Sequence, residues 1–255
     1  MNALYEILFF LLGIFLGKFF HKIGEAIPKK ERILSSHDVC ENCGHTLKWY
    51  EGIPLFSYLI SFGKCHYCKG KIDVLSTYIS FFTGLLFSVA FYSFSFSYEL
   101  LVALGIVSML MIIVVSDLNY LIIPDEVLIF FSVYFILLSF LFTGISNTFY
   151  HILYGILLFV VMYLVMVIGN FVLKKEALGG GDIKMMFLFG FLLDPFLGVL
   201  SIFIGSLFAL PISLFLLCKQ KEPVIPFGPF LLIALTFLFF TKLTTHDVLT
   251  FLQVR

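Results

Sequence analysis

Two aspartates at the edges of apolar runs are the residues of this chain best placed to do chemistry. Asp117 closes the apolar run 99–117, and Asp182 follows three glycines and opens the run IKMMFLF. Ionisable groups at membrane depth usually face the protein interior and mark function. When two carboxylates lie close together they share one proton, so the charged one activates water while the neutral one protonates a peptide carbonyl. The pair predicts an aspartic peptidase that needs no catalytic metal.

The alternative is that the two acids are independent, one ending a helix and the other capping one. Gly179, Gly180 and Gly181 favour the functional interpretation, because three glycines allow unusual backbone angles and the close approach of another chain. A cap needs at most one glycine. If the acids are catalytic, the helix dipoles predict that Asp182, at a helix N-terminus, is the charged base. Asp117, at a helix C-terminus, is then the protonated acid.

Three nearby features are candidates for supporting roles. Lys184 either gives electrostatic help to Asp182 or substrate, or it snorkels to the membrane interface. Asp125 follows Pro124 and either caps the next helix or is a third acid. The prolines in Pro226-Phe227-Gly228-Pro229 break backbone hydrogen bonding at membrane depth. That break either lines a substrate cleft or only kinks a helix.

Four cysteines form a second cluster of chemical interest. Cys40 and Cys43 belong to CENC, and Cys65 and Cys68 belong to CHYC. Two CxxC pairs separated by roughly twenty residues indicate a tetrahedral thiolate site for zinc. Four ligands would fill the coordination sphere, so such a metal is structural. Two disulfides, an unfilled site or bound iron are the alternatives.

The composition bounds the class of protein that carries these groups. The chain is 61% hydrophobic and 13% charged, whereas soluble domains are about half apolar and a quarter charged. It is therefore predicted to be a membrane protein. A net charge of zero gives no electrostatic basis for binding nucleic acid. The run 3–20 lacks a basic n-region and a cleavage site, which predicts a retained helix rather than a signal peptide.

Apolar runs of the length that crosses a bilayer, ~20 residues, recur along the chain. The pair Asp194-Pro195 divides the run 185–218 into two shorter helices. The result is an all-α bundle with spans near 3–20, 74–94, 99–117, 125–143, 149–173, 183–193, 196–217 and 224–243. The domain plan is a first transmembrane helix at 1–20, a four-cysteine domain at 21–73 and a transmembrane protease core at 74–255.

The basic residues orient these eight spans. With the N-terminus outside, all 16 Lys and Arg residues except Lys242 and Arg255 fall on the cytoplasmic side. In that orientation the four-cysteine loop lies in the reducing cytosol, where disulfides rarely persist. The charge distribution therefore favours zinc over disulfides, and it places Asp117 and Asp182 at the same face of the membrane.

These motifs resemble those of the type IV prepilin peptidases, bacterial inner-membrane aspartic proteases with eight spans and a GxGD motif. The likeness is in the expected order and covers nearly the whole chain. The segments that carry it are the paired-cysteine loop with WY and IPLFSYL, then SDLNYLIIPDEVL, then ALGGGDIK, then IPFGPFL.

The resemblance implies removal of a short basic leader from prepilins or pseudopilins, at the cytoplasmic side of a Gly–Phe junction. It assigns Asp117 and Asp182 as the catalytic pair and the four cysteines as metal ligands. It also implies methylation of the new N-terminus with S-adenosylmethionine. His21, Ala26 and Ser80 stand where the family pattern has Asn, Arg and Glu. These departures suggest a divergent branch that serves competence pseudopilins of a Gram-positive cell.

Two other classes of protein are weighed against a peptidase. A proton-coupled transporter with a zinc-stabilised cytoplasmic loop would also use intramembrane acids. However, a proton relay distributes ionisable groups through the bilayer, and the middle of these spans is nearly free of them. A non-catalytic zinc-loop adaptor would explain the cysteines but not the GGGD sequence.

Overall fold

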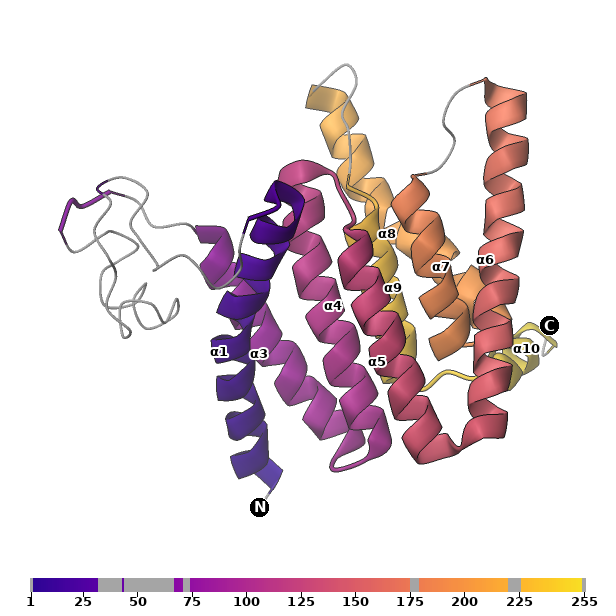
Figure 1. Ribbon diagram of the computed structural model, residues 1–255, viewed down its shortest axis with the longest axis horizontal. Helices are drawn as coiled ribbons and strands as arrows, with labels where there is room; N and C mark the ends of the chain where they lie inside the picture. Colours follow the sequence, from indigo (N-terminus) through magenta and orange to yellow (C-terminus); the bar gives the residue numbers. More distant parts are fainter. Residues whose placement is uncertain are drawn as a thin grey trace. The chain divides into compact units, whose positions relative to one another are not determined.

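The computed structural model describes residues 2–31, 43, 67–70, 74–174, 179–219 and 226–253. Regular structure in these segments is entirely helical (Figure 1), which confirms the predicted all-α class. The helices are α1 (Asn2–Lys29), α3 (Val74–Phe94), α4 (Tyr98–Tyr120), α5 (Asp125–Thr143), α6 (Ile145–Leu173), α7 (Gly180–Leu192), α8 (Pro195–Lys219), α9 (Gly228–Thr241) and α10 (Thr245–Gln253).

Six of the described helices are long and apolar enough to cross a membrane, namely α1, α3, α4, α5, α6 and α8. The chain is therefore a multi-pass helical membrane protein. The other two predicted spans are also helical, but α7 has 13 residues and α9 has 14. Both are shorter than the ~20 residues that a complete span needs, and an eight-span topology stays a prediction.

Two predicted boundaries can be compared with the structure. The pair Asp194-Pro195 separates α7 from α8, which confirms the predicted break. Helix α1 continues past the predicted end at residue 20 to Lys29. Lysine and glutamate are good helix formers, so the helix extends beyond the apolar run, with Pro28 inside its last turn. Lys30, the next residue, has a φ of 57° and ends the helix. Glu31 N–H donates to the carbonyl of Ala26.

The described residues form two compact units. One consists of Met1–Leu100 with Val107–Tyr120, and the other of Leu101–Ile106 with Leu121–Arg255. In the first unit, α1 packs closely on α3 at small residues. A methyl group on Gly13 would lie 2.6 Å from Cα of Gly84, and one on Gly17 would lie 2.5 Å from Cα of Ser80. Small residues permit this close approach of helix backbones in a membrane.

Replacing Gly17 by Ala is expected to lower the free energy of unfolding by about 1–3 kcal/mol, the usual cost of overpacking. The added methyl group meets the backbone of Ser80, which cannot rotate away. Thermal unfolding of the purified protein in detergent measures the effect. The control is Leu12→Ala, on an exposed face of the same helix. Equal melting temperatures for Gly17→Ala and the wild type would show that the helices do not pack in this way.

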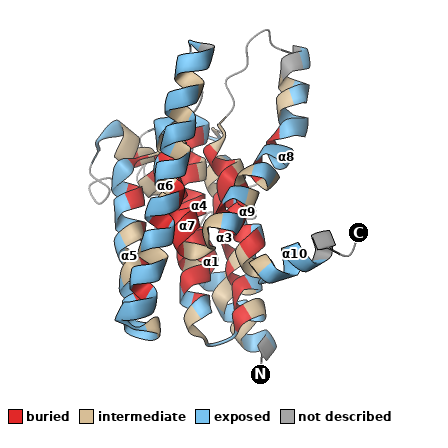
Figure 2. Cartoon of the chain, turned by 90° about the vertical axis from the view of Figure 1, so that its right-hand side faces the viewer, coloured by how far each residue is buried: buried red, intermediate tan, exposed pale blue. Residues whose placement is uncertain are grey.

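The second unit buries the short helix α7 between longer helices. Seven residues of α7 are buried, namely Ile183, Met185, Met186, Leu188, Phe189, Gly190 and Phe191. A methyl group on Gly155 of α6 would lie 2.7 Å from the carbonyl oxygen of Phe187. Figure 2 shows that α6, by contrast, is largely exposed along its length. Helix α6 thus has the apolar surface that a lipid-facing helix presents, while α7 lies inside its unit.

The C-terminal helix α10 is fixed at its start by a capping box. Thr244 N–H donates to Oδ2 of Asp247 (3.0 Å), and Asp247 N–H donates to Oγ1 of Thr244 (3.2 Å). The Thr244 hydroxyl, and then its backbone N–H, hold the pKa of Asp247 below its usual range. Thr245 Oγ1 also donates to Oδ2 of Asp194 (2.6 Å), which connects α10 to the turn between α7 and α8.

Candidate active site

Asp182 lies in the first turn of α7, as predicted. Gly179 is the N-cap residue, with φ −65° and ψ 135°, and its carbonyl accepts the first helical hydrogen bond from Ile183 N–H (3.3 Å). None of the glycines 179–181 has a positive φ. The expectation that they supply backbone angles closed to other residues is therefore wrong.

The glycines of this turn act through the space that they leave. A methyl group on Gly181 would lie 2.8 Å from Cβ of Ile123, so the side chain of Ile123 fills the position of a Cβ. One on Gly179 would lie 2.9 Å from Oδ2 of Asp182. Around Gly180 there is nothing within 4 Å. Gly181 is thus required for its close contact with Ile123, a Cβ at Gly179 would displace the Asp182 carboxylate, and Gly180 has open space around it.

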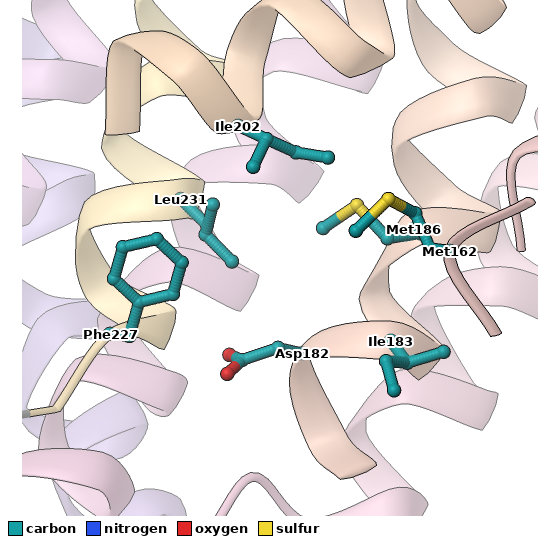
Figure 3. Close-up of a pocket in the computed structure, with 7 residues that line it drawn as sticks. All are labelled: Met162, Asp182, Ile183, Met186, Ile202, Phe227 and Leu231. Carbon is teal, nitrogen blue, oxygen red and sulfur yellow. The ribbon is translucent and has the colours of Figure 1, made fainter. Parts of the chain in front are cut away.

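The Asp182 carboxylate points into a pocket with apolar walls (Figure 3). The pocket contains about 220 Å³ of space, part of it open to the outside. Oδ1 of Asp182 is buried. A charge among apolar walls interacts with nearby groups more strongly than it would in water. The lining residues come from α6, α7, α8, α9 and the N-cap of α9 and are Met162, Asp182, Ile183, Met186, Ile202, Phe227 and Leu231.

Lys184 and Asp125 form an ion pair beside this turn. Lys184 Nζ lies 2.7 Å from both Oδ1 and Oδ2 of Asp125, and the two side chains are 51% and 55% exposed. Asp125 is the first residue of α5, whereas the N-cap is Pro124 with no side-chain capping hydrogen bond. The prediction that Asp125 caps the helix is wrong. The Lys184 ammonium therefore pairs with Asp125 and does not extend alone to the membrane interface.

Asp117 lies in the last turn of α4 and is 5% exposed, with Oδ2 buried. Its neighbour Ser116 is also buried and donates a hydrogen bond to the carbonyl of Ile113 (3.2 Å). Asp117 belongs to the unit that contains α1 and α3. The structure brings Asp182, Lys184 and Asp125 together, and the pairing of Asp117 with Asp182 stays a prediction.

The four cysteines are described only in part. Cys43 and Cys68 are exposed, and Cys40 and Cys65 lie outside the described residues. Gly70 N–H donates to Sγ of Cys68 (3.4 Å), an arrangement that stabilises a thiolate, which is the metal-binding form of cysteine. In the part of the chain that the structure describes, no three potential ligands gather at one point. The metal site at the four cysteines therefore stays a prediction.

Sequence reasoning missed several residues around Asp182. Ile123 was not singled out, although it directly precedes the proline of the IPD motif. Met162 and Ile202 carry no signal, because they lie among other apolar residues of long helices. Phe227 had a signal, the proline-bounded break, and its place in the pocket lining is consistent with the cleft interpretation of that break.

Two protein-family models match successive regions of this chain. Residues 11–94 match the bacterial peptidase A24 N-terminal domain, and residues 104–214 match the type IV leader peptidase family. The second region includes both Asp117 and Asp182. No solved structure matches the chain.

Three relatives that cover most of this chain are each described as a prepilin leader peptidase/N-methyltransferase. The protein from Bacillus subtilis (strain 168) is 30% identical over 224 residues, which cover 86% of this chain and 88% of the relative. That from Vibrio cholerae is 28% identical over 263 residues, covering 94% and 98%. That from Myxococcus xanthus is 32% identical over 202 residues, covering 78% and 60%. With both regions matched and most of the chain covered, this protein belongs to the type IV leader peptidase family, the prepilin peptidases.

Proposed function

We propose that this protein is an aspartic endopeptidase of the bacterial inner membrane that removes the leader of type IV prepilins or pseudopilins at the cytoplasmic face. The observation that carries the proposal is the carboxylate of Asp182. It stands at the start of a buried helix and points into an apolar pocket. Family membership supplies the class of reaction, and this carboxylate supplies a group suited to it.

The proposed mechanism uses Asp117 and Asp182 as one unit that shares a proton. Asp182, at a helix N-terminus, takes a proton from water, and the water oxygen attacks the scissile carbonyl carbon. Asp117, at a helix C-terminus, donates its proton to the carbonyl oxygen. The carbon–nitrogen bond then breaks as the proton held by Asp182 passes to the leaving amine, and one hydroxyl of the tetrahedral intermediate returns its proton to Asp117. The carboxylic acid of the leader and the free amine of the mature pilin are the products.

The apolar pocket suggests what Asp182 acts on. Its walls are formed by methionine, isoleucine, phenylalanine and leucine side chains, so we propose that an apolar segment of substrate lies at the mouth of this small pocket, beside the cleaved bond. The proposed topology has eight spans, with the N-terminus outside and the four-cysteine loop in the cytoplasm. It rests on the predicted runs and on the distribution of lysine and arginine.

The experiment is cleavage of a synthetic prepilin, comprising the leader and the first apolar segment, by the purified protein in detergent. Mass spectrometry identifies the new N-terminus. In the presence of S-adenosylmethionine it also reveals a transferred methyl group, the second activity that the relatives' names suggest. Wild-type protein that leaves prepilins and pseudopilins intact, under conditions where a curated relative cleaves them, would overturn the proposed function.

We expect about one tightly bound zinc per chain, held by Cys40, Cys43, Cys65 and Cys68 in a structural site. Elemental analysis of the purified protein measures the metal. Cys68→Ser should lower the zinc content, because it removes a thiolate ligand. The matched control is Cys218→Ser, at the exposed end of α8, which should keep the wild-type content. Equal zinc in both variants would show that the cysteine pairs do not bind the metal.

A further inference from the structure

Two contacts join the turn that carries Asp182 to the segment that leads into α5. Lys184 forms its ion pair with Asp125, and the backbone of Gly181 packs against the side chain of Ile123. We propose that Asp125 and Lys184 are positioning residues, which hold the first turn of α7 so that the Asp182 carboxylate is correctly aimed. The proposal rests on the catalytic role proposed for Asp182.

Among the described residues, the backbone at the start of α7 is weakly fixed by its own helix. It begins with Gly179, Gly180 and Gly181, and glycine is the residue with the greatest backbone freedom. Its N-cap residue offers no side-chain hydrogen bond, and the first helical bond, from Ile183 N–H to Gly179, is long at 3.3 Å. Contacts from outside the helix are therefore well placed to set the position of this turn.

The ion pair is placed to do so. Lys184 is two residues beyond Asp182, and its ammonium contacts both oxygens of Asp125, which is 59 residues away along the chain. Asp125 itself is anchored at the start of α5, directly after the buried Pro124. Together with the packing of Gly181 on Ile123, this ion pair favours one position of the α7 turn relative to the start of α5.

Because the ion pair is exposed, its effect on the position of the turn can be distinguished from an effect on the stability of the whole protein. Both side chains are about half exposed, and pairs of this kind contribute little to the free energy of unfolding. Catalysis is more sensitive to geometry than stability is, since small displacements of a reacting group slow the reaction greatly. Loss of the pair should thus change the turnover number more than the melting temperature.

The test compares Asp125→Asn, Lys184→Gln and the double variant, with Glu126→Gln as the matched control. Glu126 is the exposed acid next along the same helix start. Each single change is expected to lower kcat about three- to tenfold with KM and melting temperature unchanged. The double variant should be no slower than either single variant, because both remove one interaction. The exchanged pair, Asp125→Lys with Lys184→Asp, should recover part of the lost rate.

Hydrogen exchange of the backbone amides of Ile183 and Lys184 measures the order of this turn without substrate. We expect faster exchange in both single variants and wild-type exchange in Glu126→Gln. Wild-type exchange and wild-type kcat in Asp125→Asn would overturn the positioning role while leaving the proposed function intact. If the wild type cleaves no prepilin, the proposed function fails, and faster exchange would still report the contact. Rate losses that multiply in the double variant would also contradict the proposal.

Discussion

Asp182→Asn is expected to lower the rate of prepilin cleavage by roughly a thousandfold or more, because general acid–base catalysis contributes about 10²- to 10⁴-fold. Asparagine has nearly the same shape as aspartate and can remain in the first turn of α7, but it cannot take a proton from water. Single-turnover cleavage of the synthetic prepilin measures the chemical step without a contribution from product release.

Asp117→Asn should cause a loss of similar size, since the two acids are proposed to act as one unit. The double variant should then be no slower than the slower single variant. A substantial rate in either single variant, or losses that multiply, would rule out the shared-proton mechanism. Asp125→Asn is the comparison for an acid outside the catalytic pair, because its expected loss of cleavage rate is much smaller.

The protonation states of the two acids are separately testable. Infrared bands of the carboxyl groups distinguish the charged from the neutral form. In Asp117→Asn, the remaining Asp182 is expected to be charged at neutral pH, because the helix N-terminus favours a negative charge. A protonated Asp182 in that variant would reverse the proposed assignment of acid and base.

Gly181→Ala is expected to slow cleavage by about ten- to a hundredfold, the range for a small displacement of a catalytic group. The new methyl group would lie 2.8 Å from Cβ and 3.1 Å from Cδ1 of Ile123, too close for either to stay in place. The turn must move away from Ile123 and carry Asp182 with it. Steady-state cleavage and hydrogen exchange of the α7 amides measure the two consequences.

The neighbouring glycine provides a matched control. Gly180→Ala makes the same chemical change one residue away, where nothing lies within 4 Å. Alanine also favours helix over glycine, so this variant should retain wild-type activity. If both variants lose activity equally, the turn needs glycine for conformational freedom during catalysis, and the steric explanation fails.

The site and the family together favour a peptidase over a proton-coupled transporter. The curated relatives are described as leader peptidases, and the matched region contains both candidate acids. The buried polar groups of α5 and α9, such as Ser139 and Thr236, are hydroxyls rather than ionisable groups. Neither α5 nor α9 thus buries an ionisable group that would extend a proton relay from these acids.

The sequence alone determined the helical class and the approximate extent of most helices. Runs such as 74–94 and 125–143 coincide with α3 and α5, because backbone groups in a bilayer must be satisfied within the helix and length is fixed by bilayer thickness. The pair Asp194-Pro195 predicted the break between α7 and α8. The glycines before Asp182 predicted the close approach of another part of the chain, which is Ile123. The motifs also sufficed to indicate the family.

Only the tertiary structure decided which side chains surround Asp182. The pairing of Lys184 with Asp125, the packing of Ile123 on Gly181 and the pocket lined from four helices all join distant parts of the chain. In a soluble protein an apolar stripe would have marked the inward face of each helix. Here the lipid-facing and inward-facing sides are both apolar, so the sequence carries no such stripe, and contacts between helices depend on shape and small residues.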